Sequence, residues 1–379
     1  MATRKNIRSL SPTEKSDLIT AIKAVKTAGN YDAFVDAHAN VPMTNIHSCP
    51  AFLPWHRRLI LDLELEIQSV SGDSNLGLPY WNWAEDMADL ASGVLSDLKD
   101  APMWASDLMG GNGDAGDGNK VKGNPFGEGN WDTVDAALAS KGALRRSMGV
   151  EVSDLPTQAQ VNAALAITEY DAPPWNRTAT PSFRNQLEGW RPSADAPGLH
   201  NRGHVWIGGD MEDVPTAPND PAFFLHHCFV DKIWADWQVR HGVNNYLGRP
   251  DQQPSDNMEP TPSGTHPIQS TFDISALGYT YDTMVPASSS GGGSDSCLFS
   301  AVALGTSLEP SLHLMRELRD VLCASSHWGR PARRATDWYY RLSPGLIREM
   351  DRSEAIFLMV KYGAVLPVMH LLKRWKPDH

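Results

Sequence analysis

Six of the 13 histidines form two groups of three, and this grouping constrains the fold more than any other feature of the chain. The six are His38, His47 and His56 in the first group and His200, His204 and His227 in the second. Imidazole rings that are buried without an added proton need either hydrogen-bond partners or a metal ion. We therefore expect a fold that gathers distant segments around these rings.

Helical patterns surround the first group. His38 ends an apolar stretch that predicts a short helix over residues 31–38, and His47 follows in a loop. Pro54 predicts the start of another helix, which places His56 in its first turn. The pattern of this helix buries Leu59, Leu63, Leu65 and Ile67 and exposes Arg57, Arg58, Asp62 and Glu66.

The second group also lies on segments with helical spacing. His200 and His204 are four residues apart, so on a helix they share one face and can hold one metal ion. A strong helical pattern begins at Asp220–Pro221 and contains the pair His226 and His227. Helix geometry alone does not tell which of these two histidines joins the second group, because each lies on an apolar stripe of the helix.

The chemistry of the donors narrows the choice of metal. A single histidine on an apolar helix is more often a hydrogen-bonded core residue than a ligand, but two triplets favour ligation. The zinc peptidase motif needs a glutamate directly after the first histidine, and Asn201 at that position excludes it. Imidazole ligands favour copper, zinc or iron over magnesium or calcium. Three ligands per ion leave positions open, as in a reactive site, and a copper pair could bind dioxygen.

Composition excludes other classes of function. The 33 basic and 45 acidic residues give a net charge of −12, which argues against nucleic acid as a partner. The four cysteines contain no CxxC pair and are too few for a disulfide scaffold in a chain of this length. The first residues lack the apolar core of a secretory signal, so we expect a cytoplasmic protein.

The chain is predicted to contain two domains. A Gly/Ser-rich linker over 287–296 separates an acidic domain, residues 1–286 with long loops such as 110–130, from a tail over 297–379 with 12 basic and 8 acidic residues. Their opposite charges favour docking of the tail on the main domain. The tail has helical patterns, and its most apolar stretch contains a lysine and a proline, so we expect a buried, kinked helix there, with a membrane-associated hairpin as the less favoured alternative.

Three segments of the chain resemble the tyrosinase family of type-3 dicopper proteins, and the resemblance covers residues 1–286. Residues 50–57 (PAFLPWHR) resemble the first copper signature of that family. Residues 200–209 (HNRGHVWIGG) and 219–231 (NDPAFFLHHCFVD) resemble the second.

A further motif lies near the end of the main domain. Residues 277–282 (LGYTYD) resemble the tyrosine motif that closes the family's catalytic domain. In the family this motif pairs with an N-terminal arginine, which we expect to be Arg8 here.

The resemblance implies a mainly α fold. We expect a four-helix-bundle dicopper core with long loops and few short strands, followed by a small helical C-terminal domain. It also implies that His38, His47 and His56 hold one copper ion. His200, His204 and His227 would hold the second, with His226 as a packing residue.

The resemblance also implies roles for two polar residues. In hydroxylating members, a glutamate and an asparagine hold a water that helps to take the proton from a phenol. Glu188 and Asn201 match these positions. The alternative for Glu188 is an ordinary salt bridge with Arg184, four residues earlier.

The implied activity is the use of O2 to hydroxylate small monophenols at the ortho carbon and to oxidise catechols to o-quinones. The alternatives are an o-aminophenol or catechol oxidase without hydroxylase activity, a haemocyanin-like dioxygen carrier, and a non-enzymatic zinc site. In latent tyrosinases an extension covers the copper pocket with an aromatic side chain. We expect latency here too, with candidate side chains Phe299, Trp338, Tyr339 and Tyr340.

Overall fold

The computed structural model describes residues 1–123, 125–190 and 198–284 of the chain. The chain forms two units, Met1–Met284 and Val285–His379, and the described residues all belong to the first. The linker predicted over 287–296 and the domain predicted over 297–379 therefore lie outside the described residues. The same holds for the aromatic side chains expected to cover the pocket.

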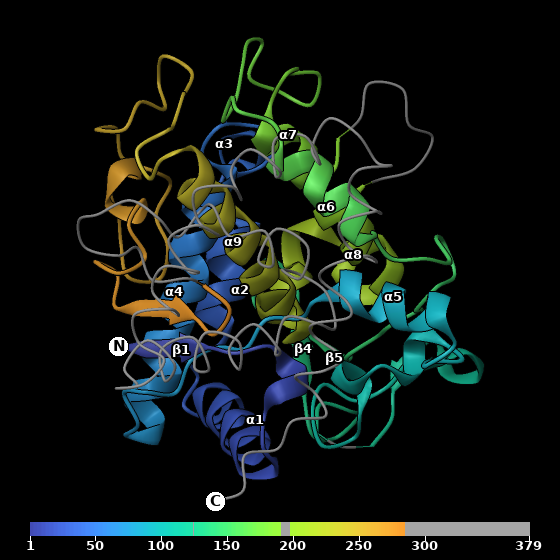
Figure 1. Cartoon of the computed structure of the whole chain (residues 1–379). Helices are drawn as coiled ribbons and strands as arrows, with labels where there is room; N and C mark the ends of the chain where they lie inside the picture. Colours follow the sequence, from blue (N-terminus) through green and yellow to red (C-terminus); the bar gives the residue numbers. More distant parts are fainter. Residues whose placement is uncertain (124, 191–197, 285–379) are drawn as a thin grey trace, which may run out of the picture. The chain divides into compact units, whose positions relative to one another are not determined.

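The described residues are mostly helical, which confirms the predicted mainly α fold. The helices are α1 (Pro12–Thr27), α2 (Asp32–Ala39), α3 (Met43–Ile46), α4 (Phe52–Ser71), α5 (Trp83–Ser92), α6 (Gln158–Leu165), α7 (Phe183–Glu188), α8 (Leu199–Ile207) and α9 (Ala222–His241). Helix α4 packs against α1 and α9, and α8 packs against both α7 and α9 (Figure 1). Within the part of the chain that the structure describes, no helix is both long and apolar enough to cross a membrane.

The first helix shows how local sequence signals set the element boundaries. Ser11 caps α1: its hydroxyl accepts the Glu14 N–H at 3.2 Å, and its own N–H donates to the Glu14 carboxylate at 2.9 Å. Pro12 occupies the first helical position, where its missing N–H leaves no hydrogen bond unmade. The helix ends at Thr27, and Gly29 then adopts a φ of +80°.

Helix α4 differs from its predicted burial pattern. It begins at Phe52, so Pro54 lies inside the first turn, where its missing N–H is still tolerated. Arg57 and Asp62, predicted to be exposed, are buried, and Leu65, predicted to be buried, is 47% exposed. Arg57 is buried because it pairs with Asp231 on α9, and Asp62 accepts hydrogen bonds from Thr261 and Ser263. Apolar spacing carries no information about such partners on distant segments.

Short strands and turns complete the fold, as the sequence predicts. Strand β1 (Ala2–Arg4) pairs in parallel with β6 (Tyr279–Tyr281), which ties the two ends of the described unit together. The loop expected over 110–130 contains a small hairpin of β2 (Gly113–Asp114) and β3 (Lys120–Val121), so it is not wholly irregular. The other pair is β4 (Asp132–Val134) with β5 (Ser140–Ala143). Short 3-10 turns cover Ile7–Ser9, Leu98–Asp100, Pro102–Trp104, Ala115–Asp117, Gly209–Met211, Val214–Asn219 and Ile268–Thr271.

The arginine that meets the tyrosine motif is Arg4, and the expectation of Arg8 is wrong. The Arg4 guanidinium lies 3.6 Å from the centre of the Tyr279 ring and donates to the Tyr281 hydroxyl at 3.3 Å. Arg4 stands opposite Tyr281 in the β1–β6 register, and its side chain is completely buried. Arg8 instead pairs with Asp86 and with a second acidic side chain on α5.

Candidate metal centre

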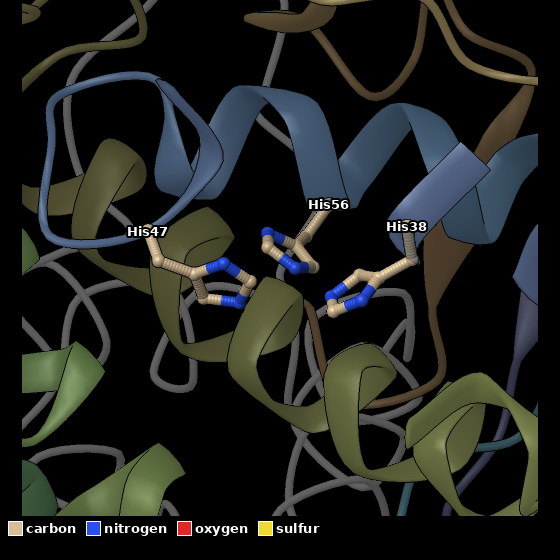
Figure 2. Close-up of side chains that lie close together, drawn as sticks. All are labelled: His38, His47 and His56. Carbon is tan, nitrogen blue, oxygen red and sulfur yellow. The ribbon is translucent and has the colours of Figure 1, made fainter. Parts of the chain in front are cut away.

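The first histidine trio comes from three separate segments. His38 lies near the end of α2, His47 directly follows α3, and His56 lies on the second turn of α4. One nitrogen from each ring lies within 4.8 Å of the others. Figure 2 shows the three rings pointing toward one another from these segments. The fold thus gathers the three histidines that the sequence grouped, in the arrangement that a shared metal ion needs.

The second trio is built by α8 and α9. The Nε2 atom of His227 lies 3.2 Å from Nε2 of His200 and 3.3 Å from Nε2 of His204. Three nitrogens bound tetrahedrally to one ion at about 2.0 Å would lie roughly 3.3 Å apart. The two separations that involve His227 are therefore those expected for ligands of a single ion.

His226 also lies close to this trio. One of its ring nitrogens falls within 4.8 Å of ligand atoms of His200 and His204, so proximity alone admits it as a ligand. Its Nε2–H, however, donates to the backbone carbonyl of His200 at 3.1 Å, and its ring stacks on the His200 ring at 5.2 Å. Of the two adjacent histidines, His227 therefore points its Nε2 at the other ring nitrogens, and His226 points its Nε2 at the backbone of α8.

The two trios lie side by side. The rings of His56 and His227, one from each trio, stack with their centres 4.5 Å apart and their planes 11° from parallel. Phe52 on α4 contacts both trios, with its ring 4.8 Å from that of His56 and 4.9 Å from that of His200. Two ions held by these trios would be close enough to share a small ligand.

Hydrogen bonds hold most of the rings in one tautomer. In four rings, Nδ1–H donates to an oxygen, which leaves the Nε2 lone pair free for a metal. The acceptors are the carbonyls of Pro215 for His38 (3.0 Å), Phe52 for His56 (2.8 Å) and Met211 for His204 (2.9 Å), and the Asn201 side chain for His200 (2.9 Å). Such hydrogen bonds orient metal-binding histidines. Nε2 of His38 and of His56 is buried and has no hydrogen-bond partner within the described residues, which fits metal ligation.

The rings are also held neutral. Burial lowers the pKa of His38 and of His204 to about 4. Burial, and then the neighbouring imidazoles, lower the pKa of the other predicted ligands well below the ordinary value; these are His47, His56, His200 and His227. Neutral imidazole is the form that binds a metal, so the residues present fit two ions with three nitrogen ligands each.

The structure places both predicted polar residues at the second trio. The Asn201 side-chain oxygen accepts the Nδ1–H of His200 at 2.9 Å, and the backbone carbonyl of Glu188 lies 3.3 Å from the same nitrogen. The Glu188 carboxylate also pairs with Arg184 at 2.9 Å, so the salt bridge considered as its alternative role is present. Burial raises the pKa of Glu188, and the positive charge of Arg184 opposes this effect.

Sequence reasoning missed residues that support the site without facing a metal. Ser48 has a φ of +52°, rare for a residue with a side chain, and its N–H donates to Glu188 at 2.6 Å. Gly203 lies inside α8, where an added Cβ would come within 2.4 Å of the His226 ring. The importance of Gly203 could have been predicted, because a glycine in the middle of a helical HxxxH segment indicates a close neighbour. The role of Ser48 could not, because its contact with Glu188 exists only in the folded chain.

Comparisons with known proteins agree with this geometry. Residues 28–240 match the common central domain of tyrosinase. The chain is 39% identical over 293 residues to a tyrosinase of Streptomyces antibioticus, covering 72% of this chain and 100% of that protein. It is 40% identical over 292 residues to a tyrosinase of Streptomyces glaucescens, covering 72% and 99%.

A solved structure supports the same assignment at the level of the fold. A mutant polyphenol oxidase from Thermothelomyces thermophila matches with a TM-score of 0.58 and 20% identity, over 74% of this chain and 88% of that chain. Because the relatives above are enzymes by name, the haemocyanin-like alternative is not supported. The chain belongs to the tyrosinase family, and its two clusters of buried histidines fit the dinuclear copper centre of a tyrosinase-type enzyme that uses O2.

Proposed function

We propose that this enzyme hydroxylates monophenols at the ortho carbon and oxidises the resulting catechols to o-quinones. In the complete reaction one monophenol and one O2 give one o-quinone and one water. The observation that carries the proposal is that the Asn201 side chain and the Glu188 backbone carbonyl both contact the His200 ring, because these two residue types accompany hydroxylation in the family that the chain resembles. Family membership supports the oxidase activity that the proposal extends.

In this proposal His38, His47 and His56 hold one copper ion, and His200, His204 and His227 hold the other. We favour His227 over His226 because Nε2 of His227 lies 3.2 and 3.3 Å from the other two ligand atoms, whereas Nε2 of His226 is committed to a backbone carbonyl. When bound, the two ions would supply the redox chemistry that reduces dioxygen.

The chain's own residues prepare the phenol. Glu188 and Asn201 would hold a water between them, and this water would take the proton from the phenolic hydroxyl. A buried carboxyl with a raised pKa is a better proton acceptor than an exposed one. Asn201 meanwhile keeps the Nδ1–H of His200 engaged, which directs Nε2 of His200 toward the metal.

The test is to load the purified full-length chain with copper and to measure O2 uptake with a monophenol, a catechol and an o-aminophenol. Turnover of both the monophenol and the catechol supports the proposal. Turnover of the catechol or the o-aminophenol without the monophenol would overturn hydroxylation and would assign the narrower oxidase instead. Failure of copper-loaded protein to turn over all three substrates would reject the proposed activity.

We also propose that the C-terminal region, residues 297–379, keeps the enzyme latent. Its net charge of +4 opposes the −16 of residues 1–296, which favours docking within the chain. A specific protease site inserted between residues 287 and 296 tests the idea. The rate of catechol oxidation should rise severalfold after cleavage. Equal rates before and after cleavage would refute the proposal that this region keeps the enzyme latent. The uncleaved variant serves as the control for the insertion.

A further inference from the structure

His47 differs from the other ligands of its trio in how its ring is held. In His38 and His56, Nδ1–H donates to a backbone carbonyl, which fixes the orientation of the ring. Nδ1 of His47 is buried and has no hydrogen-bond partner among the described residues. The ring of His47 therefore depends on its backbone for its direction more than the other two rings do.

The backbone around His47 is unusual. His47 follows the four-residue helix α3, and its N–H donates to the Met43 carbonyl at 2.7 Å. The next residue, Ser48, has a φ of +52°, in the left-handed region that residues with a side chain rarely adopt. Such a conformation persists only where surrounding contacts hold it, so the loop needs an external support.

Glu188 provides that contact from a distant element. One carboxylate oxygen of Glu188 accepts the Ser48 N–H at 2.6 Å. The other oxygen accepts from Arg184 at 2.9 Å, and Arg184 in turn pairs with Asp171 at 2.8 Å. Glu188, Arg184 and Asp171 are all completely buried. The carboxylate is thus held in place by the protein and presents a fixed acceptor to the loop.

The same residue also reaches the second trio. The backbone carbonyl of Glu188 lies 3.3 Å from Nδ1 of His200. Glu188 therefore touches the backbone next to His47 with its side chain and the ring of His200 with its backbone. It is placed to hold the two metal sites in register with each other.

We propose that Glu188 is a positioning residue for His47, in addition to any role in moving a proton. Its carboxylate fixes the backbone at Ser48 and so directs the His47 ring at the first copper ion. The inference rests on the proposed ligand role of His47 but not on the proposed role of Glu188 toward phenol. A residue that only accepts a proton through a water would leave copper affinity unchanged, whereas a positioning residue would not.

The experiment uses Glu188→Gln, in which a neutral amide cannot satisfy both Arg184 and the Ser48 N–H. Copper affinity of the full-length copper-free chain is measured by competition titration, and exchange of the Ser48 amide by hydrogen–deuterium exchange. We expect one copper equivalent to bind at least tenfold more weakly, the other to change less than threefold, and the Ser48 amide to exchange at least tenfold faster. Two equivalents of wild-type affinity with unchanged exchange would overturn the inference.

Glu64→Gln is the matched control. Glu64 is also a buried glutamate that pairs with an arginine, Arg4 at 2.8 Å, and accepts a backbone N–H, that of Leu78 at 2.8 Å. Its contacts do not include the His47 loop. Glu64→Gln should lower thermal stability while leaving both copper affinities and Ser48 exchange within threefold of wild type. The same selective weakening of one copper site in this control would refute a specific role for Glu188.

A rescue variant separates positioning from general damage to the fold. Glycine adopts the left-handed region readily, so Ser48→Gly added to Glu188→Gln should restore copper affinity to within threefold of wild type. Lack of any rescue would contradict the inference. If Glu188→Gln does not fold, Glu188→Asp replaces it, because aspartate keeps the charge beside Arg184 but shortens the reach to Ser48.

Activity then distinguishes this inference from the proposed function. Rescued copper binding without monophenol turnover would support both roles of Glu188. Unchanged copper binding in Glu188→Gln with lost monophenol turnover would overturn positioning and leave the proposed function standing. Unchanged monophenol turnover in a variant with weakened copper binding at one site would support positioning and reject the proton-transfer role.

Discussion

The His56 and His227 rings stack face to face, 4.5 Å apart, although they belong to different histidine trios. His56 lies on α4 and His227 on α9, so the packing of these two helices sets the distance between the trios. One residue after His56, the Arg57 guanidinium pairs with Asp231, which lies one turn after His227. A buried ion pair therefore fixes the contact between the two helices close to the metal centre.

We predict that Asp231→Asn destabilises the fold and loosens the metal centre. The substitution leaves Arg57 and Arg4 buried without the charge that both contact, which costs roughly 3–5 kcal/mol when one partner of a buried pair is removed. Urea denaturation measures the loss of unfolding free energy. The copper content of the purified variant, which we expect to fall, shows whether the metal centre is loosened.

The control for Asp231→Asn lies on the same helix. Asp236 pairs with Lys232 at 2.8 Å near the surface, so Asp236→Asn should change stability by less than about 1 kcal/mol. Equal effects of the two substitutions would show that the buried pair has no special part in joining α4 to α9.

We predict that the copper-free protein loses stability as the pH falls from about 6.5 to about 4. Burial lowers the pKa of His38 and of His204 to about 4, while the unfolded chain binds protons at the ordinary value of about 6.5. The unfolded state then holds more protons in this window, so stability is complete above it and falls with decreasing pH. Each ring contributes on the order of 3 kcal/mol of this loss.

Chemical denaturation of the copper-free chain across this pH range measures the slope. A variant with His38→Gln and His204→Gln should show a shallower fall, because two of the groups that protonate on unfolding are absent. Parallel curves for the two proteins would contradict the assignment of the effect to these rings.

The parts of the fold that the sequence predicted best depend on local signals. His200 and His204 share a helix face through their spacing alone, and the capping box at Ser11 fixed the start of α1. Arg57 was expected to be exposed, because its partner Asp231 lies 174 residues away and only the fold brings them together. The strained backbone at Ser48 was missed for the same reason: its support, Glu188, is 140 residues distant.

We predict that His226 and His227, although adjacent, respond oppositely to substitution. His227→Ala should remove about one copper equivalent per chain, because it deletes the Nε2 that lies 3.2 Å from that of His200. His226→Gln should keep two equivalents, because its amide N–H can still donate to the His200 carbonyl. Copper analysis of the purified variants after dialysis gives the answer. Retention of both ions in His227→Ala with loss of one in His226→Gln would reverse the ligand assignment.

We predict that Gly203→Ala weakens the second copper site more than the first. The added Cβ would lie 2.4 Å from Cε1 of His226, so the imidazole or α8 must move, and overpacking of this kind costs about 1–3 kcal/mol. Movement of α8 displaces His200 and His204, whereas the first trio lies on other segments.

Copper titration of Gly203→Ala measures the two affinities. Gly203→Ala combined with His226→Ala tests the cause, since removal of the imidazole makes room for the methyl group. If the clash is responsible, the two substitutions together should destabilise the protein by less than the sum of their separate effects. Additive effects would mean that α8 accommodates the methyl group without touching His226, and that the glycine has another role.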